Sequence, residues 1–413
     1  MSWDEWKSYT LTRWKTWWLA RHPEEVGAYS WSYLFERGKQ IRPRLFCELW
    51  RYLCPEQPVC AEAAFLIECA HVASLILDDL PWMDNAEERR GWQTLHRRFS
   101  LRKALLLTHD VLELAYEVGR SCPLLQEKAE VIRKRGSAEE EEEKAKWAEH
   151  GREKAKSLWL GQWLDVSRSG SLYEMAAWKT GTLFEAVAEG VALAAGLDPF
   201  FWGKWGNALG VLFQWVDDWD DREEDARIGQ RNAFNEAPGE TTDMYRVLWT
   251  AVVQGIGPSW WRRPFGAYLW QYFTRVFPTE VVEADHLPPL GALPTWFNRL
   301  PVLSPSLPSL LPSPSLLPSP SLSLDHAEPP SLRFMRLFQP YLERRVTEEE
   351  KEKLRVATPP KDWDIGELWD IPEEEWMGVL EDKAKVRPEL QWFLPPLRIV
   401  ERMCCETGLS STV

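Results

Sequence analysis

The sequence predicts an all-α protein, a bundle of helices that extends over about residues 1–275. Apolar residues recur every three or four positions in segments 61–80 and 101–120, which places them along one face of a helix. Segment 183–197 is apolar on nearly all sides, as is typical of a helix buried in a core. Convincing alternation of apolar and polar residues, the pattern of a half-buried strand, is missing. These observations favour helices packed around a shared core.

The composition narrows the classes of function. Apolar residues make up 45% of the 413 residues, so a sizeable core can be buried. The formal net charge of −14 argues against nucleic-acid binding, because phosphate backbones require clusters of Lys and Arg. Seven cysteines without a C-x-x-C motif argue against a disulfide framework or a zinc site, and favour a reducing, cytoplasmic environment. We expect no signal peptide and no transmembrane helix, because no apolar run reaches about 18 residues.

Three further features outline the organisation of the chain. Tryptophans near the N-terminus recur close to helical spacing, which predicts a helix face that packs inside the protein or against a partner. These residues are Trp3, Trp6, Trp14, Trp17 and Trp18. The acidic run 139–143 predicts an exposed helix or loop, and proline recurs too often in segment 303–324 for a helix. We therefore expect a helical domain at 1–300, a low-complexity linker at 301–325 and an extension of unknown role at 326–413.

Carboxylates gather at the ends of two apolar helical segments. The first motif comprises Asp78, Asp79 and Asp84, and the second comprises Asp217, Asp218 and Asp221. The members of the second motif lie three and four residues apart, and therefore on one helix face. Aspartates clustered in this way repel one another at neutral pH unless a cation lies between them. Hard oxygen ligands of this kind select Mg²⁺, which binds through one or two carboxylates plus substrate phosphate oxygens.

Basic residues accompany the acidic motifs. Arg89 and Arg90 follow the first motif directly, and the forked guanidinium group pairs with two phosphate oxygens at once. Lys39 and Arg42 form a second basic cluster upstream, which would suit a second diphosphate. Carboxylates that hold Mg²⁺, next to arginines that hold phosphate, indicate a diphosphate-binding site.

With these residues assembled, the chain resembles the trans-isoprenyl diphosphate synthase family, and most of all its bacterial geranylgeranyl diphosphate synthases. The matching segments are GKQIRP at 38–43, the stretch 71–99, GQWLDV at 161–166, KTGTLFEAV at 179–187 and FQWVDDWDD at 213–221. They keep the family's order and span about residues 30–235, and the stretch 71–99 is highly specific. The resemblance implies a single all-α bundle with a deep central cavity and with the two aspartate motifs facing each other across its mouth.

The resemblance also implies a reaction and its residues. A prenyltransferase of this family joins isopentenyl diphosphate to an allylic diphosphate, using three Mg²⁺ ions when substrate is bound, and acts as a homodimer. All six motif aspartates would hold Mg²⁺. The allylic diphosphate would be bound by Arg89, Lys179 and Thr180, with Gln214 nearby, and isopentenyl diphosphate would be bound by Lys39, Arg42, His71 and Arg90.

In the same family, the bulk of the residues just before the first motif sets the product length. Ala73 and Ser74, the fifth and fourth residues before Asp78, are both small, whereas farnesyl-length enzymes typically carry an aromatic residue there. The resemblance therefore implies a C20 product, geranylgeranyl diphosphate, unless a neighbouring tryptophan such as Trp82 or Trp215 closes the cavity.

Two alternative functions stay open. The first is a class I terpene cyclase or another prenyltransferase on the same fold, and a cyclase would not need the isopentenyl diphosphate site. The second is a non-catalytic partner subunit, which would tend to lose motif aspartates that this chain keeps. The resemblance fades after Asp221, because Gln230 stands where a lysine is expected, with Arg231 as the candidate substitute. Residues 240–413 do not align with the family at all.

Overall fold

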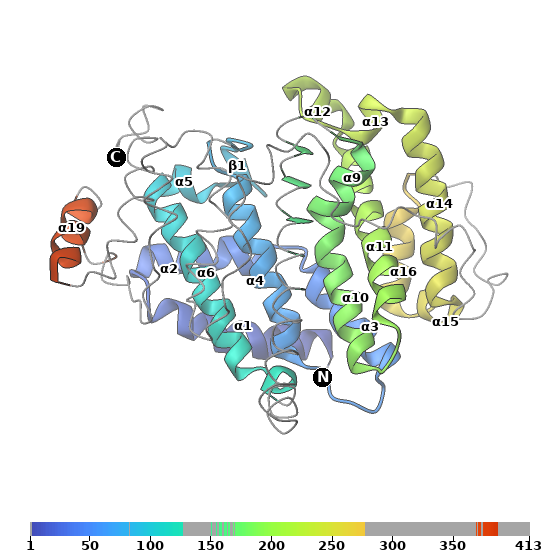
Figure 1. The fold of residues 1–413 in the computed structure, drawn as a ribbon, viewed down its shortest axis with the longest axis horizontal. Coiled ribbons are helices and arrows are strands. Elements are labelled where there is room, and N and C mark those ends of the chain that lie inside the picture. Colours follow the sequence, from blue (N-terminus) through green and yellow to red (C-terminus); the bar gives the residue numbers. More distant parts are fainter. Residues whose placement is uncertain are drawn as a thin grey trace. The chain divides into compact units, whose positions relative to one another are not determined.

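The computed structural model describes residues 2–81, 83–126 and 170–276, residues 375–386, and scattered positions between 150 and 168 and between 369 and 372. These residues are mostly helical, which confirms the predicted fold class (Figure 1). The predicted linker and the acidic run lie outside the described residues. The described residues belong to two compact units. Unit 1 takes in residues 41–60 and 141–307, and unit 2 takes in residues 2–40, 61–140 and 308–413.

Unit 2 is built around two long helices, α4 and α6, that pack against each other (Figure 1). Its described helices are α1 (Trp3–Leu19), α2 (Glu24–Trp31), the π-helical turn η1 (Ser32–Glu36), α4 (Ala61–Asp78), α5 (Leu95–Arg98), α6 (Leu101–Ser121) and α19 (Trp376–Val386). Serine side chains begin two of them: Ser2 forms a capping box with Glu5, and Ser100 accepts a hydrogen bond from the Lys103 amide. The helix expected over 61–80 ends at Asp78, so the first acidic motif begins at a helix end, as predicted.

A short hairpin in unit 2 was not predicted. Strand β1 (Glu88–Arg89) pairs antiparallel with β2 (Trp92–Gln93), and the turn between them holds Arg90 and Gly91 at φ values of 55° and 75°. A two-residue turn in which both residues have positive φ has a backbone twist that matches the twist of the two flanking strands. Strands of two residues are too short to show alternation, which is why the sequence pattern missed them.

The tryptophans of α1 form the packed face that the sequence predicts. Trp6, Trp14 and Trp18 are buried, and the Trp6 indole donates to the carbonyl of Ala61 at 3.1 Å. Trp3 stacks on Trp6, with ring centroids 4.8 Å apart. The face is therefore turned into unit 2, where aromatic burial stabilises the contact between α1 and α4.

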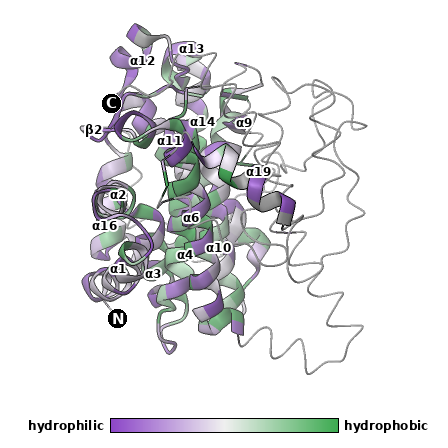
Figure 2. Ribbon diagram, turned by 90° about the vertical axis from the view of Figure 1, so that its left-hand side faces the viewer, coloured by the Kyte–Doolittle hydropathy of each residue, from purple (hydrophilic) through white to green (hydrophobic). Residues whose placement is uncertain are grey.

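Unit 1 is organised around the close pair α10 and α11. Its described elements are α3 (Ile41–Leu53), α9 (Leu172–Ala176), the π-helical turn η2 (Ala177–Gly181), α10 (Thr182–Ala194), α11 (Pro199–Asp220), α12 (Arg222–Ile228), α13 (Ala233–Glu236), α14 (Pro238–Ile256), α15 (Pro258–Trp261) and α16 (Pro264–Phe273). A Cβ added at Gly206 would lie 2.4 Å from the Phe184 carbonyl oxygen, so only glycine lets α11 approach α10 this closely. Figure 2 shows α12 in hydrophilic colours, as expected of an exposed helix that follows the second acidic motif.

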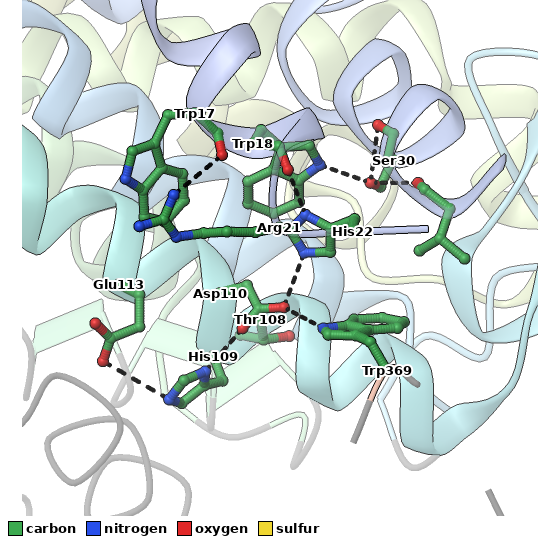
Figure 3. Close-up of polar contacts among 12 residues, drawn as sticks. Trp17, Trp18, Arg21, His22, Ser30, Thr108, His109, Asp110, Glu113 and Trp369 are labelled. Atoms are coloured by element: carbon green, nitrogen blue, oxygen red, sulfur yellow. Dashed lines mark hydrogen bonds and ion pairs between the residues drawn. The ribbon is translucent and has the colours of Figure 1, made fainter. Parts of the chain in front are cut away.

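The predicted C-terminal extension contributes a contact inside unit 2. The Trp369 indole donates to Asp110 on α6 at 3.0 Å, and its ring packs edge-on against His22 (Figure 3). At least this part of segment 326–413 is thus packed on the helices of unit 2. None of the described helices combines the length and the apolar character that crossing a bilayer requires.

Candidate functional site

The first acidic motif forms a turn at the end of α4. Pro81 cannot continue the helix, and the chain turns so that the Asp84 amide donates to the Asp78 carbonyl oxygen at 3.0 Å. Asp78 is half-buried and Asp84 is exposed, whereas Asp79 is only 2% exposed. The two outer aspartates are thus brought to the same helix end with accessible side chains, while the middle one points into unit 2.

Two donors from other elements of unit 2 hold the buried Asp79. Tyr33, in the π-helical turn η1, donates its hydroxyl to Asp79 Oδ2 at 2.6 Å, and Arg89 Nε donates to Oδ1 at 2.7 Å. Burial, together with the charge of Asp79, raises the pKa of Tyr33 above its ordinary value, so this hydroxyl stays protonated and donates. Hydrogen bonds of this length to a carboxylate are charge-assisted and strong.

The basic residues predicted for unit 2 gather around the same place. A Cβ added at Gly38 would lie 3.2 Å from Arg90 Nη1, so the Arg90 guanidinium lies against the backbone next to Lys39. Lys39 is exposed. His71 is half-buried on α4, two turns before Asp78 and therefore on the same face of that helix. Lys39 and Arg90 are thus brought together by the structure.

Arg42, the fourth residue predicted to bind isopentenyl diphosphate, lies in unit 1. It is buried on α3, and its guanidinium lies 5.0 Å from the centre of the Phe184 ring. Its predicted role in binding isopentenyl diphosphate stays a prediction.

The second acidic motif lies at the end of α11 in unit 1. Asp217 is half-buried and accepts the Tyr272 hydroxyl at 2.6 Å, and Asp221 is exposed. Asp218 is buried, with Gln214 Nε2 at 2.9 Å from Oδ1 and the Ala233 amide at 3.0 Å from Oδ2. Both motifs therefore share one arrangement, in which the outer aspartates are accessible and the middle aspartate is held by protein donors.

The environment of Asp218 raises the pKa of its carboxyl group. Burial raises the pKa of this carboxyl to about 7, although the hydrogen bonds from Ala233 and Gln214 lower it. The hydroxyl of Thr180 donates to Gln214 Oε1 at 2.7 Å, so Thr180, Gln214 and Asp218 form one chain of hydrogen bonds. The structure thereby connects the predicted Thr180 and Gln214 to the motif.

Lys179, beside Thr180 in the π-helical turn η2, forms an ion pair with Asp165. Lys179 Nζ lies 2.5 Å from Asp165 Oδ2, and the side chains of both residues are mostly buried. A π-helical turn inside a helix often marks a functional site, because the extra residue turns side chains out of the regular helical positions. Here the turn coincides with the KTG segment that the sequence singled out.

The accessible carboxylates fit Mg²⁺ by their chemistry. Asp78, Asp84, Asp217 and Asp221 offer oxygen ligands, which Mg²⁺ prefers, and it takes few of them from protein. Within the described ranges, no three side chains of His, Cys, Asp or Glu are grouped closely enough to hold a metal ion by themselves. An ion bound at either motif would take its remaining ligands from water and from substrate phosphate oxygens.

Sequence reasoning missed several residues that hold the motifs. Tyr33 lies outside the segments that the sequence analysis singled out, and Asp165 lies within GQWLDV but was assigned no role. Tyr272 is separated from Asp217 by 55 residues. Arg231, the candidate substitute for the expected lysine, turns inward to the Leu164 carbonyl at 3.1 Å and to Glu236 at 3.3 Å. No motif signals any of these contacts, because they depend on how the helices pack.

Comparison with known proteins identifies the family of the chain. The sequence profile of the polyprenyl synthetase family matches residues 24–235. The chain therefore belongs to this family. Among its relatives, the geranylgeranyl diphosphate synthase of Cereibacter sphaeroides is 31% identical over 183 residues, which are 44% of this chain and 59% of that protein. The heterodimeric geranylgeranyl pyrophosphate synthase large subunit 2 of Arabidopsis thaliana is 30% identical over 223 residues, which are 50% of this chain and 54% of that protein.

Solved structures show a more distant likeness. A geranyltranstransferase from Thermotoga maritima has 24% identity and a TM-score of 0.45, with 61% of this chain and 87% of that chain covered. A geranyltransferase from Helicobacter pylori has 22% identity and a TM-score of 0.46, with 67% and 96% covered. The chain spans about 52–61% of the length of three curated geranylgeranyl diphosphate synthases that it matches.

Proposed function

We propose that this chain is a Mg²⁺-dependent trans-prenyltransferase that condenses isopentenyl diphosphate with an allylic diphosphate. The observation that carries the proposal is the common arrangement of the two motifs. In each motif, the outer aspartates are accessible, and the middle aspartate is buried and accepts hydrogen bonds from other protein groups. Membership of the polyprenyl synthetase family supports the same reaction.

In this proposal, Asp78, Asp84, Asp217 and Asp221 bind Mg²⁺ directly, with up to three ions when substrate is present. Asp79 and Asp218 are the other two of the six predicted ligands, and their hydrogen bonds to protein donors hold each motif in shape. When bound there, Mg²⁺ would supply positive charge that stabilises the leaving diphosphate.

The cationic side chains bind and orient the two substrates. Arg89 has five N–H donors, and those not used by Asp79 can pair with oxygens of the allylic diphosphate, as can Lys179 and Thr180. Lys39, Arg42, His71 and Arg90 bind isopentenyl diphosphate. Preorganised cations at the point where negative charge develops lower the barrier to reaction.

In the proposed reaction, one carbon–oxygen bond breaks and one carbon–carbon bond forms. The allylic carbon–oxygen bond breaks, and diphosphate leaves with the electron pair. The double bond of isopentenyl diphosphate attacks the allylic carbon to form a new carbon–carbon bond. A proton is then lost from the resulting cation to the departing diphosphate, which restores a double bond. Water has to be excluded meanwhile, or the allylic cation would be converted to an alcohol.

The test is a product assay with purified protein, Mg²⁺, isopentenyl diphosphate and C5, C10 or C15 allylic diphosphates in turn. We expect a C20 product, geranylgeranyl diphosphate, sized after phosphatase treatment, and no product when EDTA replaces Mg²⁺. Elongation without any metal dependence would contradict the proposal. If no primer is elongated, a cyclic hydrocarbon product would identify a terpene cyclase, and no turnover at all would favour a partner subunit.

The product length gives a separate prediction. Ala73 and Ser74 lie on α4 one turn before the first motif, and a large ring at position 74 would shorten the space for the growing chain. We expect Ser74→Phe to stop elongation at C15, measured by the same assay. Ser74→Ala is the matched control, because it removes the hydroxyl that donates to the His71 carbonyl at 2.8 Å but adds no bulk. A C20 product from Ser74→Phe would show that another residue forms the end of the cavity.

We further propose that the protein works as a homodimer in the cytoplasm. Five cysteines within the described residues are buried and form no disulfide, which fits a reducing compartment. They are Cys47, Cys54, Cys60, Cys69 and Cys122. Sedimentation equilibrium of the purified protein tests the dimer, and a monomer at micromolar concentration would rule it out.

A further inference from the structure

Helix α16 lies beyond residues 24–235, the part of the chain that matches the family, yet it contacts the second acidic motif. The Tyr272 hydroxyl donates to Asp217 Oδ1 at 2.6 Å. The ring of Tyr272 stacks on Phe213, with centroids 5.1 Å apart and planes 16° from parallel. Phe213 and Asp217 are one turn apart on the same face of α11. The stacked ring therefore aims the hydroxyl at the carboxylate one turn further along.

Arg275 fixes the end of α16 in the same place. Its guanidinium lies 4.4 Å from the centre of the Tyr272 ring, and Nη1 lies 3.1 Å from Asp220 Oδ2. Tyr272 is only 7% exposed. Three independent contacts thus define the position of one hydroxyl group.

We propose that Tyr272 is a positioning residue for the second motif, one that orients the Asp217 carboxylate so that its other oxygen can bind a divalent cation. This inference rests on the proposed function, in which Asp217 is a Mg²⁺ ligand. A carboxylate held by a strong hydrogen bond at one oxygen has fewer orientations to lose when the other oxygen binds a metal. Such supporting contacts typically account for a tenfold to hundredfold difference in metal affinity.

The experiment compares Tyr272→Phe with a matched variant, Tyr245→Phe. Tyr245 is likewise buried in unit 1, and its hydroxyl donates to the Phe273 carbonyl oxygen at 2.7 Å rather than to a motif aspartate. Each substitution removes one buried hydroxyl and leaves the ring in place. Mg²⁺ binding in the presence of inorganic pyrophosphate is measured by titration calorimetry on the full chain, and the Mg²⁺ dependence of turnover is measured alongside.

We expect Tyr272→Phe to weaken Mg²⁺ binding by about tenfold or more, and Tyr245→Phe to leave it unchanged. Equal Mg²⁺ affinity for Tyr272→Phe and the parent protein would overturn the inference, and so would an equal loss in both variants, since that would reflect packing alone. If the parent protein binds Mg²⁺ but elongates no primer, the proposed reaction fails while the calorimetry still decides the role of Tyr272. A parent protein that binds no Mg²⁺ with pyrophosphate overturns both.

Discussion

The Asp217→Asn variant is expected to lose about 100- to 1000-fold in kcat, the range found when one group that stabilises transition-state charge is removed. The amide keeps the size of the side chain, and its oxygen can still accept the Tyr272 hydroxyl. What it removes is the negative charge that a Mg²⁺ ion requires of its ligand. We expect a loss of the same order for Asp78→Asn, at the end of α4 in unit 2. Steady-state kinetics over a range of Mg²⁺ concentrations measure both.

The control for this prediction is Glu224→Gln, on helix α12, which follows the second motif. The Glu224 side chain is 58% exposed and pairs with Arg227 on the same helix. An exposed ion pair of this kind contributes little, so we expect a kcat close to that of the parent protein. If Asp217→Asn retains the kcat of the parent protein, or loses no more than Glu224→Gln, then Asp217 does not hold a catalytic metal ion. Circular dichroism of each variant confirms that its helices are intact.

The sequence predicts those parts of the fold and site that depend on local pattern. The apolar spacing places α4 and α6, and the continuous apolar run places the core helix α10. Both aspartate motifs lie at helix ends, because charged residues interrupt an apolar pattern where the chain leaves the core. These features can be predicted without knowing which helices pack against each other.

The contacts that hold the motifs could not be predicted, for two physical reasons. Tyr272 reaches Asp217 through tertiary packing across 55 residues, and no spacing rule reports such a contact. Tyr33 lies in a π-helical turn, in which an extra residue shifts the helical phase, so a regular period of 3.6 misplaces its side chain. The hairpin at residues 88–93 depends on a two-residue turn, which is visible only in the backbone.

A stability prediction concerns Asp110, which accepts three hydrogen bonds inside unit 2 (Figure 3). His22 Nε2 and Trp369 Nε1 lie 2.9 and 3.0 Å from Oδ2, and His109 Nδ1 lies 2.9 Å from Oδ1. The other ring nitrogen of His22 lies 2.8 Å from the Trp18 carbonyl oxygen. Both ring nitrogens of His22 therefore lie within hydrogen-bond distance of an oxygen.

We expect Asp110→Ala to lower the free energy of unfolding by about 3–5 kcal/mol, because it leaves several buried donors without an acceptor. Trp369→Phe keeps the ring against His22 and removes one hydrogen bond, so it should cost about 1 kcal/mol. Glu113→Ala is the control on the same helix, since Glu113 is only half-buried and its carboxylate lies 3.7 Å from His109. Urea unfolding followed by circular dichroism measures all three. If Asp110→Ala costs no more than Glu113→Ala, the three hydrogen bonds do not support unit 2.

Acid titration of the same proteins checks the charge of Asp110 independently. Burial alone would raise the pKa of this carboxyl, but the hydrogen bonds from His109 and His22 outweigh it and lower the pKa from 3.8 to about 2. Because the pKa is lower in the folded state, this group stabilises the fold fully above about pH 4 and loses its effect as the pH falls towards 2. The difference in unfolding free energy between the parent protein and Asp110→Ala should therefore shrink over this interval. A difference that stays constant from pH 7 to pH 2 would show that the effect comes from packing rather than from the carboxylate charge.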